Sequence, residues 1–165
     1  MNNSWKIYPG GPHVPGQNSR PPENAEIQAL LAELPAQIIA DDWCHIGAYQ
    51  QGLAFFEAGF FWEAHEVWEA VWVKCAPNSR EKYLLQGLIQ VANACLKVRM
   101  RRKRGALKLA QEASMLIREA FLSKPDVRVM GVSFKDITAE LDGFTAKLEV
   151  EKTTEEIFPQ INLLI

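Results

Sequence analysis

The chain is organised around residues 59–72, which read GFFWEAHEVWEAVW. At helical spacing the apolar side chains of this stretch share one face, which holds Phe61, Ala64, Trp68, Val71 and Trp72. His65 and Glu69, one turn apart, lie on the flank of that face, and Glu66 lies further round. An ordinary amphipathic helix carries its carboxylates opposite the large aromatics. The stretch therefore predicts a helix with a candidate polar site at the edge of the core.

Length and composition favour one ordinary globular domain. The chain has 165 residues, of which 48% are hydrophobic and 23% charged, and its formal net charge is −2. So small a charge is typical neither of a nucleic-acid-binding protein nor of a strongly acidic surface. The three cysteines form no C-x-x-C pair, and no apolar run approaches the roughly 20 residues of a membrane span. We expect a protein without membrane contact in the reducing cytoplasm.

The sequence divides into an extended arm over 1–23, a helical domain over 24–150 and an apolar tail over 151–165. Prolines and glycines exclude regular helix from the arm, while Trp5, Ile7 and Tyr8 give it apolar surface to bury. No segment alternates as a strand would, so the fold class is all-α, a single compact domain of five or six helices. The predicted helices cover 24–34, 42–58, 60–75, 79–100, 106–122 and 133–148, with N-caps at Asn24, Asp42, Asn78 and Ser133.

The predicted helix over 79–100 is apolar round most of its circumference, which indicates a buried helix. Its polar residues nevertheless recur at helical spacing and form a stripe of Gln86, Gln90, Asn93 and Lys97. The short loop after residue 75 makes this helix the antiparallel neighbour of the helix over 60–75. We therefore expect His65 and Glu69 to face Gln86, Gln90 or Asn93 in one largely buried cluster. The candidate polar site comprises Glu63, His65, Glu66, Glu69, Gln86, Gln90 and Asn93.

Two interpretations of His65-Glu66-x-x-Glu69 stay open. The spacing is that of a zinc-binding helix in which residues i and i+4 bind the metal and residue i+1 is the general base, with glutamate in place of the second histidine. His65 and Glu69 would then hold a divalent metal, although neither His13 nor His45 has a spacing that makes it the third ligand. The favoured interpretation is a hydrogen-bonded network that fixes helix packing, in which His65→Leu would cost about 1–3 kcal/mol.

Three tryptophans line the same helix and form an aromatic wall beside the candidate site. Trp68 and Trp72 lie on the apolar face and are interpreted as core residues. Trp62 points nearer to the carboxylates and is expected to be partly exposed, as an interface anchor would be.

A basic run ends the helix over 79–100, with six cations at Lys97, Arg99, Arg101, Arg102, Lys103 and Arg104. Cations stabilise the negative end of a helix, and no aromatic residues interleave here to stack on bases. Helix capping and solvation are favoured over nucleic-acid binding.

These residues resemble the DUF309 family, a domain of unknown function with a small helical fold. The resemblance is carried by FEAGFFWEAHEVWE over 56–69, by Trp72, by LQGLIQVA over 85–92 and by RGA over 104–106. It is strong over 55–105 and weaker in the flanks. The resemblance implies a fold and a set of characteristic positions, and it implies no activity.

The sequence thus predicts a binding or interaction module built round the polar cluster. The alternative is a small-molecule or metal-dependent hydrolase-like site on the His65-Glu66-x-x-Glu69 helix. The apolar tail over 157–165 and the arm around Trp5 are expected to cover a groove on the same domain. A groove on a twofold partner, which would make a homodimer, stays open.

Overall fold

The computed structural model of the protein describes residues 8, 10–150 and 158–161. The regular structure of the described residues is helical, with no strand and only an isolated bridge between Val129 and Val132. The element order is α1 (Ala25–Ala32), the 3-10 helix η2 (Ala40–His45), α2 (Gly47–Glu57), α3 (Phe61–Val73), α4 (Arg80–Arg99), α5 (Lys103–Phe121) and α6 (Phe134–Glu149). The all-α prediction is confirmed. The division into arm, domain and tail stays a prediction.

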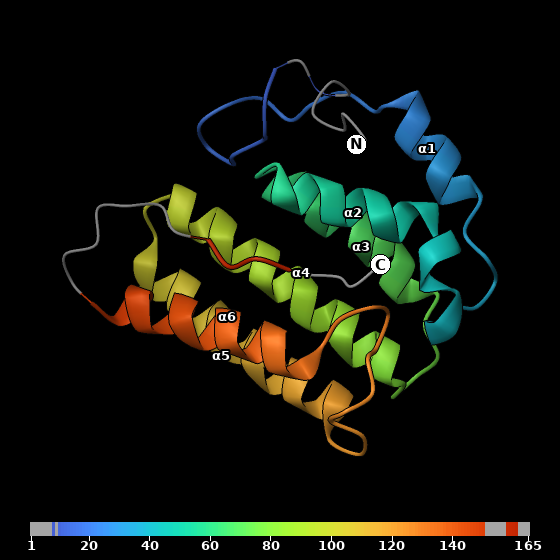
Figure 1. Ribbon diagram of the computed structural model, residues 1–165. Helices are drawn as coiled ribbons and strands as arrows, with labels where there is room; N and C mark the ends of the chain where they lie inside the picture. The colour runs from blue at the N-terminus through green and yellow to red at the C-terminus, as the bar shows by residue number, and fades with distance from the viewer. Residues whose placement is uncertain (1–7, 9, 151–157, 162–165) are drawn as a thin grey trace.

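Helices that follow one another in the chain also pack against one another, from α2 to α6 (Figure 1). Helix α4 lies at the centre, between α3 and α5, and residues 158–161 cross in front of it (Figure 1). The contacts of α4 with α3 run from Lys82 against Trp72 at one end to Arg99 against Phe61 at the other. The two helices are therefore antiparallel neighbours, as the short loop predicted.

Two large aromatic side chains are buried where α2 meets α3. Trp68 and Tyr49 are fully buried, and the Trp68 indole Nε1 donates a hydrogen bond to the Tyr49 carbonyl at 3.3 Å. The indole lies directly over Gly52, where a Cβ would come within 2.2 Å of Nε1. Glycine is required at this position because the approach of the two helices leaves no room for a methyl group.

Two of the predicted N-caps are confirmed and two are wrong. The Asn24 and Ser133 side chains cap α1 and α6 as predicted, accepting hydrogen bonds from backbone N–H groups of the first turn. Asp42 does not cap α2, because it lies in the first turn of η2, a 3-10 helix that the prediction had merged with α2. Helix α4 is capped by Ser79, and Asn78 instead takes a left-handed conformation with φ 58°.

Both flanking segments fold back onto this domain where they are described. In the arm, Tyr8 packs on Phe55 and Val14 is buried. In the tail, Phe158 packs on Phe61 with ring centroids 4.7 Å apart, and Ile161 is buried. The other apolar residues on which the tail and arm predictions rested, among them Trp5, Ile7 and Leu163 to Ile165, lie outside the described residues.

None of the helices in the described part of the chain combines the length and apolar character needed to span a bilayer.

Candidate functional site

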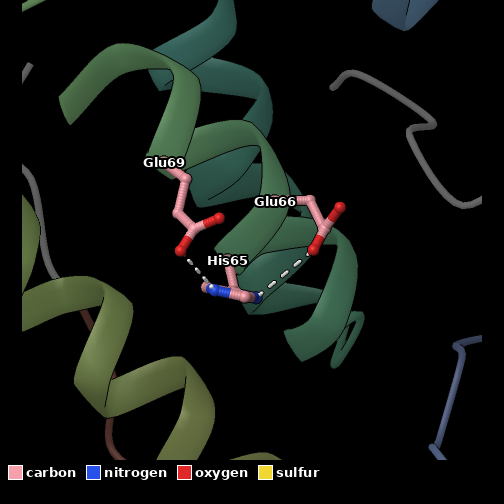
Figure 2. A group of neighbouring side chains, drawn as sticks. All are labelled: His65, Glu66 and Glu69. Atoms are coloured by element: carbon pink, nitrogen blue, oxygen red, sulfur yellow. Dashed lines mark ion pairs between the residues drawn. The ribbon is translucent and has the colours of Figure 1, made fainter. Parts of the chain in front are cut away.

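His65, Glu66 and Glu69 come together on one side of α3, and the imidazole lies between the two carboxylates (Figure 2). Its Nε2 is 3.0 Å from Glu69 Oε1, and its Nδ1 is 3.8 Å from Glu66 Oε1. Their candidate ligand atoms all lie within 4.8 Å of one another, the only such group of three or more among the residues described. The two carboxylates flank opposite ring nitrogens, whereas an ion binds one nitrogen of an imidazole. In this rotamer a metal would take Nε2 and Glu69, and Glu66 would have to reach round the ring edge.

The structure differs from the predicted buried cluster in two ways. The Glu69 side chain is 55% exposed, so its pair with His65 is a surface interaction of about 0–1 kcal/mol. Gln86, Gln90 and Asn93 are half-buried along α4, and no hydrogen bond joins them to His65 or Glu69 in the part of the chain described. The side-chain contacts that join α3 and α4 are instead those of Lys82 with Trp72 and of Arg99 with Phe61.

Glu63 is the member of the predicted site that the fold buries, on the edge of α3 away from His65. It is 2% exposed, and its Oε1 accepts a hydrogen bond from the His13 backbone N–H at 2.8 Å. The second oxygen, Oε2, is buried and has no hydrogen-bond partner among the described residues. A carboxylate in this setting retains an unused acceptor, which is costly unless a donor reaches it.

Burial governs the proton affinity of this carboxyl group. Desolvation raises the pKa of Glu63, and the hydrogen bond from His13 together with the charges of His13 and Arg99 opposes the rise without cancelling it. The pKa of Tyr8 is also raised, first by burial and then by the negative charge of Glu63. Tyr8 and Glu63 therefore belong to one electrostatic site.

A cavity of about 140 Å³ borders this site, between the arm, α1 and α3. Tyr8, Trp62, Glu63 and Glu66 contribute to its wall, together with Arg20, Pro21, Pro22, Glu23, Asn24, Ile27, Gln28, Leu31 and Val67. The Arg20 guanidinium lies 4.8 Å from the Trp62 ring centroid, and its Nη2 is 3.1 Å from Glu66 Oε2. Glu66 thus lies close to both His65 and Arg20, a residue of the cavity wall.

The three tryptophans have separate roles and do not form one wall. Trp68 is fully buried in the core. The Trp72 ring lies under the Lys82 ammonium at 4.2 Å, and the same ammonium reaches the carbonyls of Trp72 and Cys75 at the end of α3. Trp62 is half-buried as expected, and it packs edge-to-face on His13 with centroids 4.9 Å apart.

Two residues of the basic run, Arg99 and Lys103, hydrogen-bond to backbone carbonyls elsewhere in the chain. Arg99 donates a hydrogen bond to the Gly59 carbonyl and stacks on Phe61 and Phe158. Lys103 Nζ donates to the Val150 carbonyl at 2.6 Å. These contacts are of the capping and packing kind that the sequence favoured.

Sequence reasoning did not identify two arm residues as partners of α3: Arg20, which lines the cavity, and His13, which bonds Glu63. The only signal was the apolar content of the arm, which indicated that it lies along the domain. The arm residues contact α3 residues that lie about fifty positions further along the chain, as His13 contacts Glu63. No local sequence pattern predicts which residues form such pairs.

Residues 49–109 match the family model described as Domain of unknown function (DUF309), which confirms the resemblance seen in the sequence. The matched stretch contains Trp62, Glu63 and the His65 group, but none of the arm residues that complete the cavity. No curated protein and no solved structure matches the chain.

Proposed function

We propose that the chain is a small-molecule-binding module whose site is the cavity between the arm, α1 and α3. The observation that carries the proposal is the Glu63 carboxylate, which borders the cavity at 2% exposure with Oε2 unpartnered among the described residues. Ligand sites combine apolar and aromatic walls with a few placed polar groups. Here Trp62, Ile27 and Val67 supply the wall, and Glu63 supplies the polar group.

A larger cavity of about 510 Å³, bordered by Arg99, Phe61 and residues 158–161, supports a binding function less well. Arg99 already bonds Gly59 and stacks on two phenylalanine rings. Among the described residues, four buried polar atoms lack a partner, on Gln51, Glu63, His65 and Trp72, and none of them belongs to a residue of this wall. The cationic group of this wall, Arg99, is therefore already engaged within the fold.

A fragment screen by NMR on the ¹⁵N-labelled full chain tests the proposal. We expect fragments to shift the Trp62 indole resonance together with the amides of Ile27 and Val67, because all three residues border the cavity. Gln28 is exposed on α1 at the cavity wall, so Gln28→Trp should block entry and abolish these shifts without unfolding α1. Gln111→Trp, on the exposed side of α5, is the matched control and should leave them unchanged. A screen that moves none of these resonances, or moves them equally in Gln28→Trp, would refute the proposal.

A second function, metal-dependent hydrolase-like chemistry on α3, is favoured by one observation, the close approach of the donor atoms of His65, Glu66 and Glu69. It predicts stoichiometric Zn²⁺ or Mn²⁺ binding in calorimetric titration. Glu69→Gln should abolish that binding, and Glu119→Gln, an exposed carboxylate on α5, should retain it. Equal, weak binding in all three proteins would exclude this function and leave the first.

A further inference from the structure

We propose that the ligand of the arm–α3 cavity is a small organic cation with a primary ammonium group, and that Arg20 is its built-in competitor. This inference rests on the proposed function and specifies its ligand. Four features of the cavity carry it: the charge of the wall, the unused acceptor of Glu63, the aromatic face of Trp62 and the volume.

The wall of the cavity is acidic. It holds three carboxylates, Glu23, Glu63 and Glu66, against one cationic side chain, Arg20. Opposite charge near a buried carboxylate favours its ionised form and offsets the desolvation that Glu63 experiences. The wall therefore selects for positive charge and against carboxylate or phosphate ligands.

Glu63 Oε2 specifies a hydrogen-bond donor. An ionised carboxylate only accepts hydrogen bonds, and Oε1 is already occupied by the His13 N–H at 2.8 Å. An ammonium N–H pointing at Oε2 would satisfy the remaining oxygen with a charge-assisted bond, the stronger kind. A quaternary ammonium, which has no N–H, could not do so.

Arg20 shows that this wall already binds a cation. Its guanidinium lies over the Trp62 ring at 4.8 Å and bonds Glu66 at 3.1 Å, the aromatic-plus-carboxylate combination that recognises cations. The Arg20 side chain is 69% exposed, so its ion pair is a weak surface contact that a ligand can displace. Arg20 and an incoming ammonium would compete for Trp62 and Glu66.

The volume sets the size of the ligand. A cavity of about 140 Å³ is close to that of an engineered protein cavity of about 150 Å³ that binds benzene. A ligand of about six heavy atoms therefore fits, which corresponds to a short alkyl ammonium.

The test compares three probes of similar size, n-butylammonium, n-butanol and tetramethylammonium, by NMR titration of the full chain at the Trp62 indole. We expect n-butylammonium to bind about tenfold more tightly than either other probe, since the loss of a charge-assisted hydrogen bond is worth about that factor. The alcohol lacks the charge, and tetramethylammonium lacks the donor.

Three variants locate the effect. Glu63→Gln keeps an oxygen for the His13 N–H and should remove the tenfold preference for n-butylammonium, while Glu119→Gln should retain it. Arg20→Ala should tighten n-butylammonium several-fold. Thermal unfolding of each variant checks that it is folded.

The outcomes separate this inference from the proposed function. Butanol binding as well as butylammonium, or a preference unchanged in Glu63→Gln, overturns the cation assignment while the cavity remains a binding site. Weaker butylammonium binding in Arg20→Ala overturns the competitor role. Absence of any Trp62 shift with all three probes overturns the cation assignment, and the fragment screen then decides whether the binding function itself stands.

Discussion

Gly52→Ala should lower the free energy of unfolding by an amount at the upper end of the roughly 1–3 kcal/mol typical of overpacked cores. The new Cβ would lie 2.2 Å from Trp68 Nε1 and 2.4 Å from Cδ1, and Trp68 is fully buried. The indole cannot move aside without losing its hydrogen bond to Tyr49 and its stacking on Phe56. Chemical denaturation of the two proteins, compared at constant m-value, measures the change.

Gly143→Ala is the matched control, because nothing lies within 4 Å of its added Cβ on exposed α6. It should stabilise the protein by about 0.5–1 kcal/mol through helix propensity alone. The double variant Gly52→Ala with Trp68→Phe should be less destabilised than the sum of the two single variants, because the smaller ring leaves room for the methyl group. Additive effects would show that the clash with Trp68 is not the cause.

Arg99→Ala should destabilise the protein by roughly 2–4 kcal/mol, combining a lost charge-assisted hydrogen bond with lost cation–π contacts. The guanidinium bonds the Gly59 carbonyl and lies 4.6 Å from the Phe61 centroid and 5.4 Å from that of Phe158. It therefore ties the α2–α3 turn and the tail to the end of α4. Thermal and denaturant unfolding give the size of the effect.

Arg104→Ala is the control within the same basic run, exposed in the first turn of α5. Its effect should stay within about 0.5 kcal/mol, as for ordinary surface substitutions. Equal losses in the two variants would mean that net charge, and not the contacts of Arg99, sets the stability.

Much of the fold could be predicted because its signals are local. The Ser133 cap of α6 and the Asn24 cap of α1 depend on side chains bonding backbone two or three residues away. The adjacency of α3 and α4 follows from a short loop. The predictions were wrong where two local signals compete: Asp42 is a good N-cap, yet Asp42 falls within η2 and α2 starts at Gly47.

The sequence predicted which residues of α3 belong to the candidate site, but not the environment of each side chain. The sequence placed Glu63, His65, Glu66 and Glu69 on one helix, which is correct, but it expected His65 and Glu69 to face the polar stripe of α4 in a buried cluster. Their environments diverge because neighbouring positions on a helix point in different directions: His65 pairs with the exposed Glu69, and Glu63 lies toward the arm. Glu63 is the carboxylate that is buried, because the arm packs over it, and no local sequence pattern predicts that contact.

The way the arm joins the domain has a consequence for the order of folding. Helices α2 to α6 each pack on their chain neighbour, so most of the fold forms through short loop closures and should form rapidly. The arm bonds α3 and α4 across much larger separations, from His13 to Glu63 and from Gln17 to Arg99. Docking of the arm costs a larger loop-closure entropy and forms few contacts. We therefore expect the arm to be the last segment to dock during folding and the first to detach when the native state opens locally. The cavity has one wall made of that segment, so the proposed binding site should form only after the helical body is complete.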